Sequence, residues 1–323
     1  MKKNDFDYRC LKCHKPLERM SGSLSCSSGH VVNINNGVPI FAMQGEGENE
    51  YSVSAAVEMH ENALAWLFST FGGSEDELRR DLISKLYLKK GQRVLVTGVG
   101  AGNDLPHIAE KIGISGCIVA LDYAKPMLDE AVSRVNGRYD LSDYDIEFCL
   151  CDATELPFED EQFDAAYHFG GINLFDDIGL ALSEMDRVVK EGGAVVVSDE
   201  GLAPWMRKTT LGKMLINNNP LYAYEAPLYH LPDNVRDVEL SWLMKDCFYV
   251  ISFRVSKHTK QVRLDVVHKG VRGGSIESRY NGVLEGVSPA IKNNIYQTAK
   301  NLGVSRVELI ESLLLNGLAE SKK

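Results

Sequence analysis

Short apolar runs alternate with amphipathic stretches through the middle of the chain. The amphipathic stretches carry apolar residues at helical spacing, whereas the apolar runs have the length of buried strands. Five runs are predicted to be strands, at residues 93–97, 117–121, 146–151, 163–168 and 194–198. Strands that alternate with helices form parallel sheets, which bind ligands at the carboxyl ends of the strands. The pattern therefore predicts an α/β fold.

The flanking segments follow other patterns. Residues 55–88 show helical spacing broken by Gly72-Gly73, which predicts two helices ahead of the first strand. An aromatic, proline-containing segment, 202–232, interrupts the pattern after the fifth strand. The apolar runs at 247–255 and 262–268 are predicted to be the sixth and seventh strands, paired as a closing antiparallel hairpin.

The C-terminal tail predicts a strand followed by two helices. Ser288-Pro289 begins one helix, which Gly303 ends, and Ser305-x-x-Glu308 is a capping box that opens a second helix. A short run at 281–287 precedes both. This order resembles a ribbon-helix-helix module, a class that dimerises through its strand and often binds DNA. The run lacks the polar or basic residues that would contact bases, so homodimerisation or docking onto the core is favoured over DNA binding.

A glycine-rich turn follows the first core strand. Gly98, Gly100 and Gly102 alternate there, and glycine lets a backbone turn sharply and approach a ligand closely. The second strand then ends in one carboxylate, Asp122, which can accept hydrogen bonds from both hydroxyls of a ribose. This arrangement of strand, glycine turn, helix, strand and acid is typical of sites for nucleoside-bearing cofactors.

The G-x-G-x-G spacing resembles the first motif of class I S-adenosylmethionine (SAM) methyltransferases rather than the G-x-G-x-x-G of dinucleotide sites. Downstream, Leu156-Pro-Phe158 resembles the same class, and the segment 181–193 resembles its ubiquinone and menaquinone biosynthesis members. The resemblance covers residues 91–200. It implies a Rossmann-like, seven-stranded class I methyltransferase sheet, SAM as cofactor and methyltransferase activity. It also implies that segment 202–232 shapes the substrate pocket.

The resemblance assigns roles to residues at the strand ends. The three glycines would pass over the cofactor, and the other implied cofactor-binding residues are Asp122 with Tyr123 at the ribose and Asp152 with Ala153 beside the adenine. Family members usually hold the amino group of SAM with an acid where this chain has Val96, so Asp104 or Asn103 would have to substitute.

One histidine, His168, falls at the carboxyl end of a predicted strand. It is therefore the predicted catalytic, substrate-lining residue. A histidine that lies beside the cofactor without chemistry is an equal alternative.

The N-terminal segment carries the pattern Cys10-x2-Cys13-x12-Cys26-x3-His30, which favours a closed structural Zn²⁺ site. His14 is an alternative ligand, but His30 pairs better with Cys26. Residues 37–41 would form a strand closing this ribbon. It is similar to the zinc ribbon of 23S rRNA guanine-N1 methyltransferases, where the ribbon helps to hold RNA. The alternative is a ribbon that only stabilises or docks the N-terminus, because no basic stripe is evident.

Composition limits the partners. The chain of 323 residues has a formal net charge of −10, which disfavours nonspecific binding to nucleic acid. No apolar run reaches membrane-spanning length and no apolar signal region follows the N-terminus, so a cytoplasmic protein without a membrane span is predicted. Four cysteines in apolar runs are interpreted as buried hydrophobic residues: Cys117, Cys149, Cys151 and Cys247.

The predicted organisation is a zinc ribbon (1–43), a methyltransferase domain (52–270) and a strand-helix-helix tail (271–323). Within the second part, 52–90 is a helical preface, 91–200 the core, and 201–270 the substrate insertion and closing strands. The leading hypothesis is transfer of a methyl group from SAM to a small molecule by in-line displacement. The alternatives are an RNA methyltransferase that uses the ribbon, and a non-catalytic SAM-binding regulator that dimerises through the tail.

Overall fold

The computed structural model describes residues 7–41, 55–281 and 288–322. Residue contacts divide the chain into two compact units, Met1–Thr259 and Lys260–Lys323. The first unit contains both the N-terminal ribbon and the large sheet. Residues 44–51, between the predicted ribbon and the predicted methyltransferase domain, lie outside the described residues, and the predicted domain division stays a prediction.

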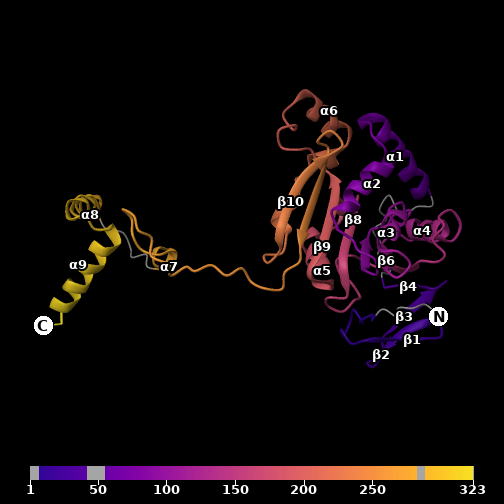
Figure 1. Cartoon of the computed structure of the whole chain (residues 1–323), viewed down its shortest axis with the longest axis horizontal. Coiled ribbons are helices and arrows are strands. Elements are labelled where there is room, and N and C mark those ends of the chain that lie inside the picture. The colour runs from indigo at the N-terminus through magenta and orange to yellow at the C-terminus, as the bar shows by residue number, and fades with distance from the viewer. Residues whose placement is uncertain (1–6, 42–54, 282–287, 323) are drawn as a thin grey trace. The chain divides into compact units, whose positions relative to one another are not determined.

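A seven-stranded sheet forms the centre of the first unit, in the order β10-β11-β9-β8-β5-β6-β7 (Figure 1). Strands β5 to β9 run parallel, and β11 pairs antiparallel with both β9 and β10. The predicted α/β class and seven-stranded sheet are confirmed. The bounds are β5 Arg93–Thr97, β6 Cys117–Asp122, β7 Asp145–Leu150, β8 Phe163–Phe169, β9 Val189–Glu200, β10 Arg236–Leu243 and β11 Phe248–Arg254.

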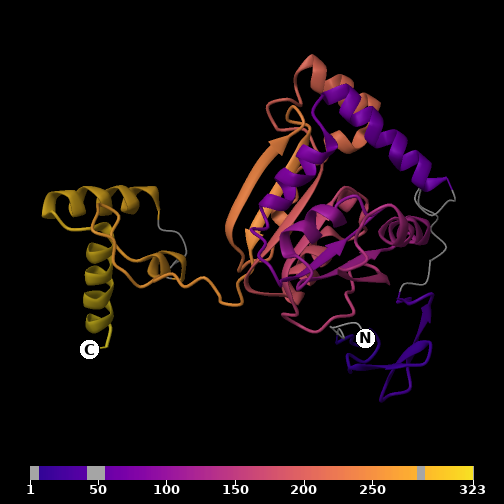
Figure 2. The same cartoon turned by 45° about the vertical axis from the view of Figure 1, so that its right-hand side comes forward.

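Helices cover the two faces of this sheet (Figure 2). Gly72 and Gly73 separate the first two helices as predicted, and the Ser74 side chain caps the second by accepting from the Glu77 amide. The α-helices of this unit are α1 Ala56–Phe71, α2 Glu75–Ser84, α3 Leu105–Ile112, α4 Lys125–Gly137, α5 Ile178–Val188 and α6 Thr210–Asn218. Three short 3₁₀ turns accompany them: η1 Ile172–Leu174, η2 Pro220–Ala223 and η3 Leu228–His230.

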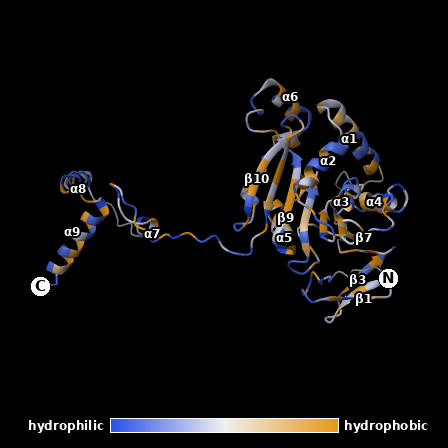
Figure 3. Ribbon diagram, viewed as in Figure 1, coloured by the Kyte–Doolittle hydropathy of each residue, from blue (hydrophilic) through white to orange (hydrophobic). Residues whose placement is uncertain are grey.

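Alternation along each strand divides the core into two hydrophobic layers. Val94 and Val96 of β5 pack into the layer that contains α2, α3 and α4, whereas Leu95 packs into the layer that contains α5. Figure 3 shows hydrophobic residues along the strands of the sheet. Because the inner strands are buried on both faces, they are apolar along their length, which is why the sequence marks them clearly.

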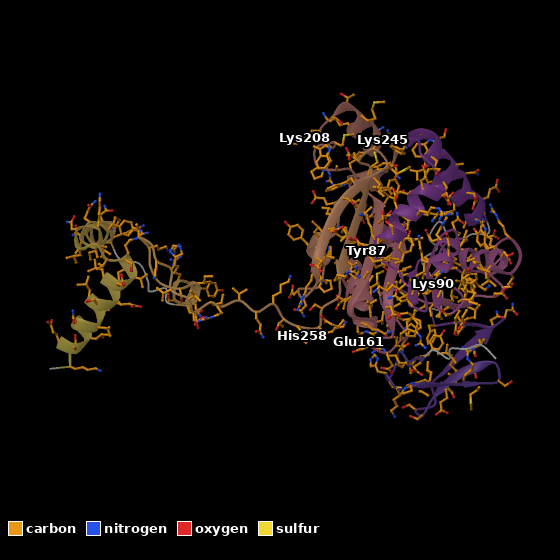
Figure 4. All side chains as sticks on the ribbon, in the orientation of Figure 1. Tyr87, Lys90, Glu161, Lys208, Lys245 and His258 are labelled. Atoms are coloured by element: carbon orange, nitrogen blue, oxygen red, sulfur yellow. The ribbon has the colours of Figure 1, made fainter. Side chains whose placement is uncertain are left out.

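The predicted seventh strand at 262–268 is wrong. The strand that pairs with β11 is β10, which precedes β11 in the chain, and residues 262–268 lie in the second unit without strand structure. A tight turn in which Met244, Lys245 and Asp246 have positive φ joins β10 to β11 (Figure 4). Strand β10 is an edge strand without fully buried residues, so it shows only the alternation of Val238, Leu240 and Trp242.

The N-terminal ribbon is a four-stranded antiparallel sheet in the order β1-β2-β3-β4. Its strands are β1 Leu17–Met20, β2 Ser23–Cys26, β3 Val31–Asn35 and β4 Val38–Pro39, so the predicted closing strand is present. Beyond β4, Ile40 forms a parallel bridge with Leu150 of β7. Leu17 and Leu24 belong to the same buried cluster as α5 and the central sheet. The ribbon therefore shares a core with the sheet.

The second unit contains α7 Ile276–Asn281, α8 Pro289–Leu302 and α9 Arg306–Glu320. The predicted caps are confirmed: Ser288 accepts from the Ile291 amide, Gly303 has a left-handed φ of 68°, and Ser305 and Glu308 form the reciprocal capping box. The predicted strand at 281–287 falls on residues outside the described ones, except for Asn281, which ends α7.

Candidate cofactor and active site

A cavity of about 930 Å³ lies at the carboxyl ends of the parallel strands. Eight of the nine residues predicted to bind cofactor line this cavity: Gly98, Gly100, Asp104, Asp122, Tyr123, Asp152, Ala153 and His168. The ninth, Gly102, lies outside the lining. A Cβ at Gly102 would lie 3.2 Å from the Cβ of Ala131. Gly102 therefore allows α4 to pack closely against the turn.

The glycine turn leaves β5 with three left-handed residues. The φ angles are 61° at Gly98, 56° at Gly100 and 84° at Gly102, a region that favours glycine. A Cβ at Gly98 would also lie only 2.8 Å from Cε1 of His168. Gly98 is thus required both by its backbone conformation and by the imidazole packed beneath it.

Asp122 ends β6 and holds the glycine turn in place. Its Oδ2 accepts from the Gly100 amide at 2.8 Å, and its Oδ1 accepts from the Ala124 amide at 2.8 Å. Burial raises the pKa of this carboxyl to about 6, although the backbone donors oppose that rise. The carboxylate therefore lies on the cavity wall with its orientation fixed by two amides.

The turn after β7 forms the neighbouring wall. Oδ1 of Asp152 accepts from both the amide and the hydroxyl of Thr154, at 2.8 and 2.7 Å. Cys151 also lines the cavity, and burial raises the pKa of its thiol well above the ordinary value. A protonated, buried thiol is a poor nucleophile, which agrees with interpreting the core cysteines as hydrophobic residues.

His168 is fully buried at the end of β8. Its Nδ1 lies 3.1 Å from the Thr97 hydroxyl, and the Phe175 ring packs edge-on with 5.2 Å between centroids. Its Nε2 has no hydrogen-bond partner among the described residues. Burial lowers the pKa of His168, which favours a neutral imidazole. A neutral imidazole with one unused nitrogen can exchange a hydrogen bond or a proton with a ligand.

Asp104 is paired with residues that the sequence analysis missed. Its Oδ2 lies 2.6 Å from Nη1 of Arg79 on α2, and its Oδ1 accepts from the Tyr167 hydroxyl at 3.0 Å. Arg79 also lines the cavity. The sequence gives no sign that Arg79 belongs to the site, because Arg79 lies in a helix with ordinary surface charges. Only the packing of α2 against α3 brings it there.

Val96 and Asn103 are the other two positions considered for binding the amino group of SAM. Val96 is 2% exposed in the core and lies outside the cavity lining. Asn103 lines the cavity, but its amide is engaged, because Nδ2 donates to Glu75 and Oδ1 accepts from Arg134, both at 2.8 Å.

Helix α1 and part of the insertion at 202–232 also line the cavity. From α1 come His60, Leu64, Trp66 and Leu67, and from the insertion come Asn218, Asn219 and Tyr222. Trp205, Tyr224 and Tyr229 lie outside the lining, and Trp205 packs against Trp242 instead. The insertion thus contributes to the cavity through residues 218–222 near its middle.

The four predicted metal ligands come together in the ribbon. Ligand atoms of Cys10, Cys13, Cys26 and His30 all lie within 4.8 Å of one another. The Cys10 sulfur is 3.3 Å from Nδ1 of His30, and the Cys13 and Cys26 sulfurs are 3.6 Å apart. Three thiols and one imidazole are a donor set that suits a closed tetrahedral zinc site. His14, the alternative ligand, is outside this group.

Comparison with known proteins agrees with the geometry. A family model described as a methyltransferase domain matches residues 95–197. Residues 95–197 of this chain are therefore similar to methyltransferase domains. The ubiquinone/menaquinone biosynthesis C-methyltransferase UbiE of Xanthomonas oryzae pv. oryzae is 30% identical over 164 residues, which cover 49% of this chain and 64% of that protein.

Two further relatives are similar over part of their length. The demethylmenaquinone methyltransferase of Oceanobacillus iheyensis is 32% identical over 118 residues, covering 36% of this chain and 48% of that protein. The structure of Haemonchus contortus phosphoethanolamine N-methyltransferase 2 has a TM-score of 0.49 at 16% identity, covering 66% of this chain and 61% of that one. The chain spans less than two thirds of the length of these proteins.

Among the described residues, no helix is both long enough and apolar enough to cross a membrane.

Proposed function

We propose that the chain transfers a methyl group from SAM to a small-molecule acceptor bound beside β8 and β9. The observation that carries the proposal is the convergence of the glycine turn, Asp122, Asp152 and His168 on one cavity. When bound, SAM supplies a methyl group that is already activated by attachment to a positively charged sulfur. The protein then has to align the acceptor in line with the methyl group and to exclude water.

The cofactor would lie across the ends of β5, β6 and β7. Gly98 and Gly100 leave its path free of side chains, and the Asp122 carboxylate accepts from the ribose hydroxyls. Asp152 and Ala153 flank the adenine. The two amides that bind Asp122 keep its carboxylate oriented before the ligand arrives, so little ordering is needed on binding.

His168 lies on the acceptor side, because β8 and β9 follow β5 in the sheet order. Its neutral imidazole is the group we assign to accept a proton from the acceptor or to orient it by a hydrogen bond. The hydroxyl of Thr97, 3.1 Å from Nδ1, fixes the ring. The Phe175 ring restricts its other side.

A small molecule is favoured over RNA by the charges of the site. Among the residues that line the cavity, Arg79 alone is a lysine or arginine, and it is already paired with Asp104. Binding of a polyphosphate depends on several such cations. We propose Zn²⁺ in the ribbon as a structural ion, because the ribbon packs into the core of the methyltransferase unit. Homodimerisation through the tail stays a prediction.

Isothermal titration calorimetry with SAM and S-adenosylhomocysteine tests the proposal. Asp122→Ala should weaken binding at least about 100-fold, because each hydrogen bond to a charged group contributes about 1.5–3 kcal/mol and two would be lost. Asp129→Ala is the matched control, because Asp129 is an aspartate on α4 whose side chain is 62% exposed. Unchanged affinity in Asp122→Ala would refute the ribose assignment. A wild-type protein that ignored both ligands at millimolar concentration would refute the function.

A further inference from the structure

The cavity carries more negative charge than the proposed cofactor site uses. Six carboxylates line it, against one guanidinium, Arg79, which is paired with Asp104. The proposed cofactor site uses Asp122 and Asp152. The three remaining carboxylates are Asp176, Asp177 and Glu200. These three lie on segments that follow β8 or end β9, in the part of the cavity that we call the acceptor end.

The three carboxylates approach His168 from two elements. Asp176 and Asp177 directly follow Phe175, whose ring packs against the His168 imidazole with 5.2 Å between centroids. Glu200 is half-buried at the end of β9, the strand beside β8 in the sheet, and His168 is the last residue but one of β8. An acceptor beside His168 therefore meets negative charge on two sides.

Aromatic rings form the rest of the acceptor end. Phe169, Tyr222 and Phe248 line the cavity, with 6.3 Å between the centroids of Phe169 and Phe248 and 6.4 Å between those of Tyr222 and Phe248. Burial raises the pKa of Tyr222, and the Glu200 carboxylate adds to that rise, so this carboxylate lies close to the aromatic group. The faces of aromatic rings attract cations. Rings beside carboxylates suit a positively charged group on an apolar body, and they repel an anion.

The second requirement of a cationic acceptor is a base, and His168 can supply it. Its Nε2 is fully buried and has no hydrogen-bond partner among the described residues. An ammonium group has donors but no lone pair, so it must lose a proton before its nitrogen can accept a methyl group. Burial lowers the pKa of His168, whereas the buried Asp199 carboxylate opposes that change and would stabilise the imidazolium once the proton arrives.

We propose that the methyl acceptor is a primary or secondary amine on an aromatic body, bound as its ammonium ion against Glu200 and Asp176. This inference rests on the proposed SAM function and specifies its acceptor. In the reaction, an N–H bond of the ammonium breaks and the proton passes to Nε2 of His168. The nitrogen lone pair then forms the N–C bond while the C–S bond of SAM breaks. The electron pair of that bond stays on sulfur, which leaves S-adenosylhomocysteine.

Probes that share one ring and one chain length test the charge preference. Calorimetry on the protein saturated with S-adenosylhomocysteine should compare 2-phenylethylamine, 2-phenylethanol and 3-phenylpropanoate, which end in an ammonium, a hydroxyl and a carboxylate. The amine should bind at least about 10-fold more tightly than the alcohol, the lower end for a hydrogen bond to a charged group. The carboxylate should bind most weakly. With SAM present, mass spectrometry should detect a methylated product from the amine alone.

The outcomes separate this inference from the SAM function, because binding of S-adenosylhomocysteine is measured first. Equal binding of the three probes, or binding of none of them, would overturn the amine assignment and leave the SAM function standing. A protein that does not bind S-adenosylhomocysteine would overturn both.

A double variant then tests the carboxylates. Asp176→Asn with Glu200→Gln removes two charges at nearly constant size, and Asp177 is left in place because its side chain caps α5. Affinity for the amine should fall at least about 10-fold, while affinities for the alcohol and for S-adenosylhomocysteine stay as in the wild type and show that the variant is folded. Asp129→Asn with Glu225→Gln is the matched control, because these side chains are 62% and 79% exposed. An undiminished preference for the amine in the first double variant would overturn the proposal.

Discussion

Removing the hydroxyl of Tyr8 should loosen the ribbon from the methyltransferase core. Glu147 lies on β7 with its side chain only 7% exposed, and Arg19 of the ribbon contacts the same Oε1 at 2.7 Å. Tyr8 donates to that Oε1 at 2.8 Å, and its ring packs between Phe41 and Phe158. Burial raises the pKa of Tyr8 well above its ordinary value, which keeps the phenol protonated as the donor.

Tyr8→Phe deletes this donor and keeps the ring. A hydrogen bond to a charged group contributes about 1.5–3 kcal/mol, so the first unit should lose that much free energy of unfolding. For a domain of 150–250 residues each kcal/mol shifts Tm by about 2–4 °C, so the expected decrease is about 3–12 °C.

The measurement is thermal unfolding of the zinc-loaded chain by calorimetry. Tyr229→Phe is the matched control, because that tyrosine is 98% exposed and should leave Tm unchanged. A double-mutant cycle with Glu147→Gln should give a coupling of about 1 kcal/mol or more, as expected for residues in direct contact. If Tyr8→Phe unfolds at the same Tm as the wild type and shows no coupling to Glu147→Gln, the view that the ribbon and the sheet share one core is refuted.

Two further expectations concern the cofactor and the metal. Because burial raises the pKa of Asp122 to about 6, and ribose hydroxyls donate to the ionised form, SAM affinity should rise as pH increases from about 5 to about 7. The same raised pKa makes the ligand-free fold lose stability as pH rises from about 4 to about 6, since the native state binds the extra proton in that interval. Calorimetry and thermal melts of Asp122→Asn at several pH values should show both slopes flattened; unchanged slopes would assign them to another group. The chain should also contain one zinc by atomic absorption, and Cys10→Ser should lose it; undiminished metal content would exclude the four-ligand site.

How far the sequence predicts this fold depends on burial. The five parallel strands are apolar along their length because helices cover both faces of the sheet, and each was placed to within a few residues at the carboxyl end. Strand β10 was not predicted because it is only half buried at the edge of the sheet. Residues 262–268 have the apolar composition of a strand but do not form one. The prediction for residues 262–268 was wrong because apolar content alone does not determine which segment pairs with β11. The turn at Met244–Asp246 determines it, because this turn joins β10 directly to β11.

The sequence predicts the site residues that belong to a local motif, but it does not predict the pairs that are distant along the chain. The glycine turn and Asp122 form a local motif in which spacing carries the information, and both line the cavity as expected. Arg79 and Tyr167 reach Asp104 from 25 and 63 residues away, and Tyr8 reaches Glu147 from 139 residues away. Such pairs have no signature in a single sequence, because each member is an ordinary polar residue of its own element.

These distant pairs decide what the smallest folded methyltransferase unit is. The family match covers residues 95–197, which include Asp104 and Glu147 but exclude Arg79, Tyr8 and Arg19. Removing the partner of a buried charge destabilises a protein by about 3–5 kcal/mol. Two such losses would remove most of the free energy of unfolding of a typical domain, which is about 5–15 kcal/mol. A fragment limited to the matched residues should therefore fail to fold, whereas the unit that ends at Thr259 retains every partner. Soluble, cooperative unfolding of the 95–197 fragment would show that the ribbon and the helical preface are accessories rather than parts of the core.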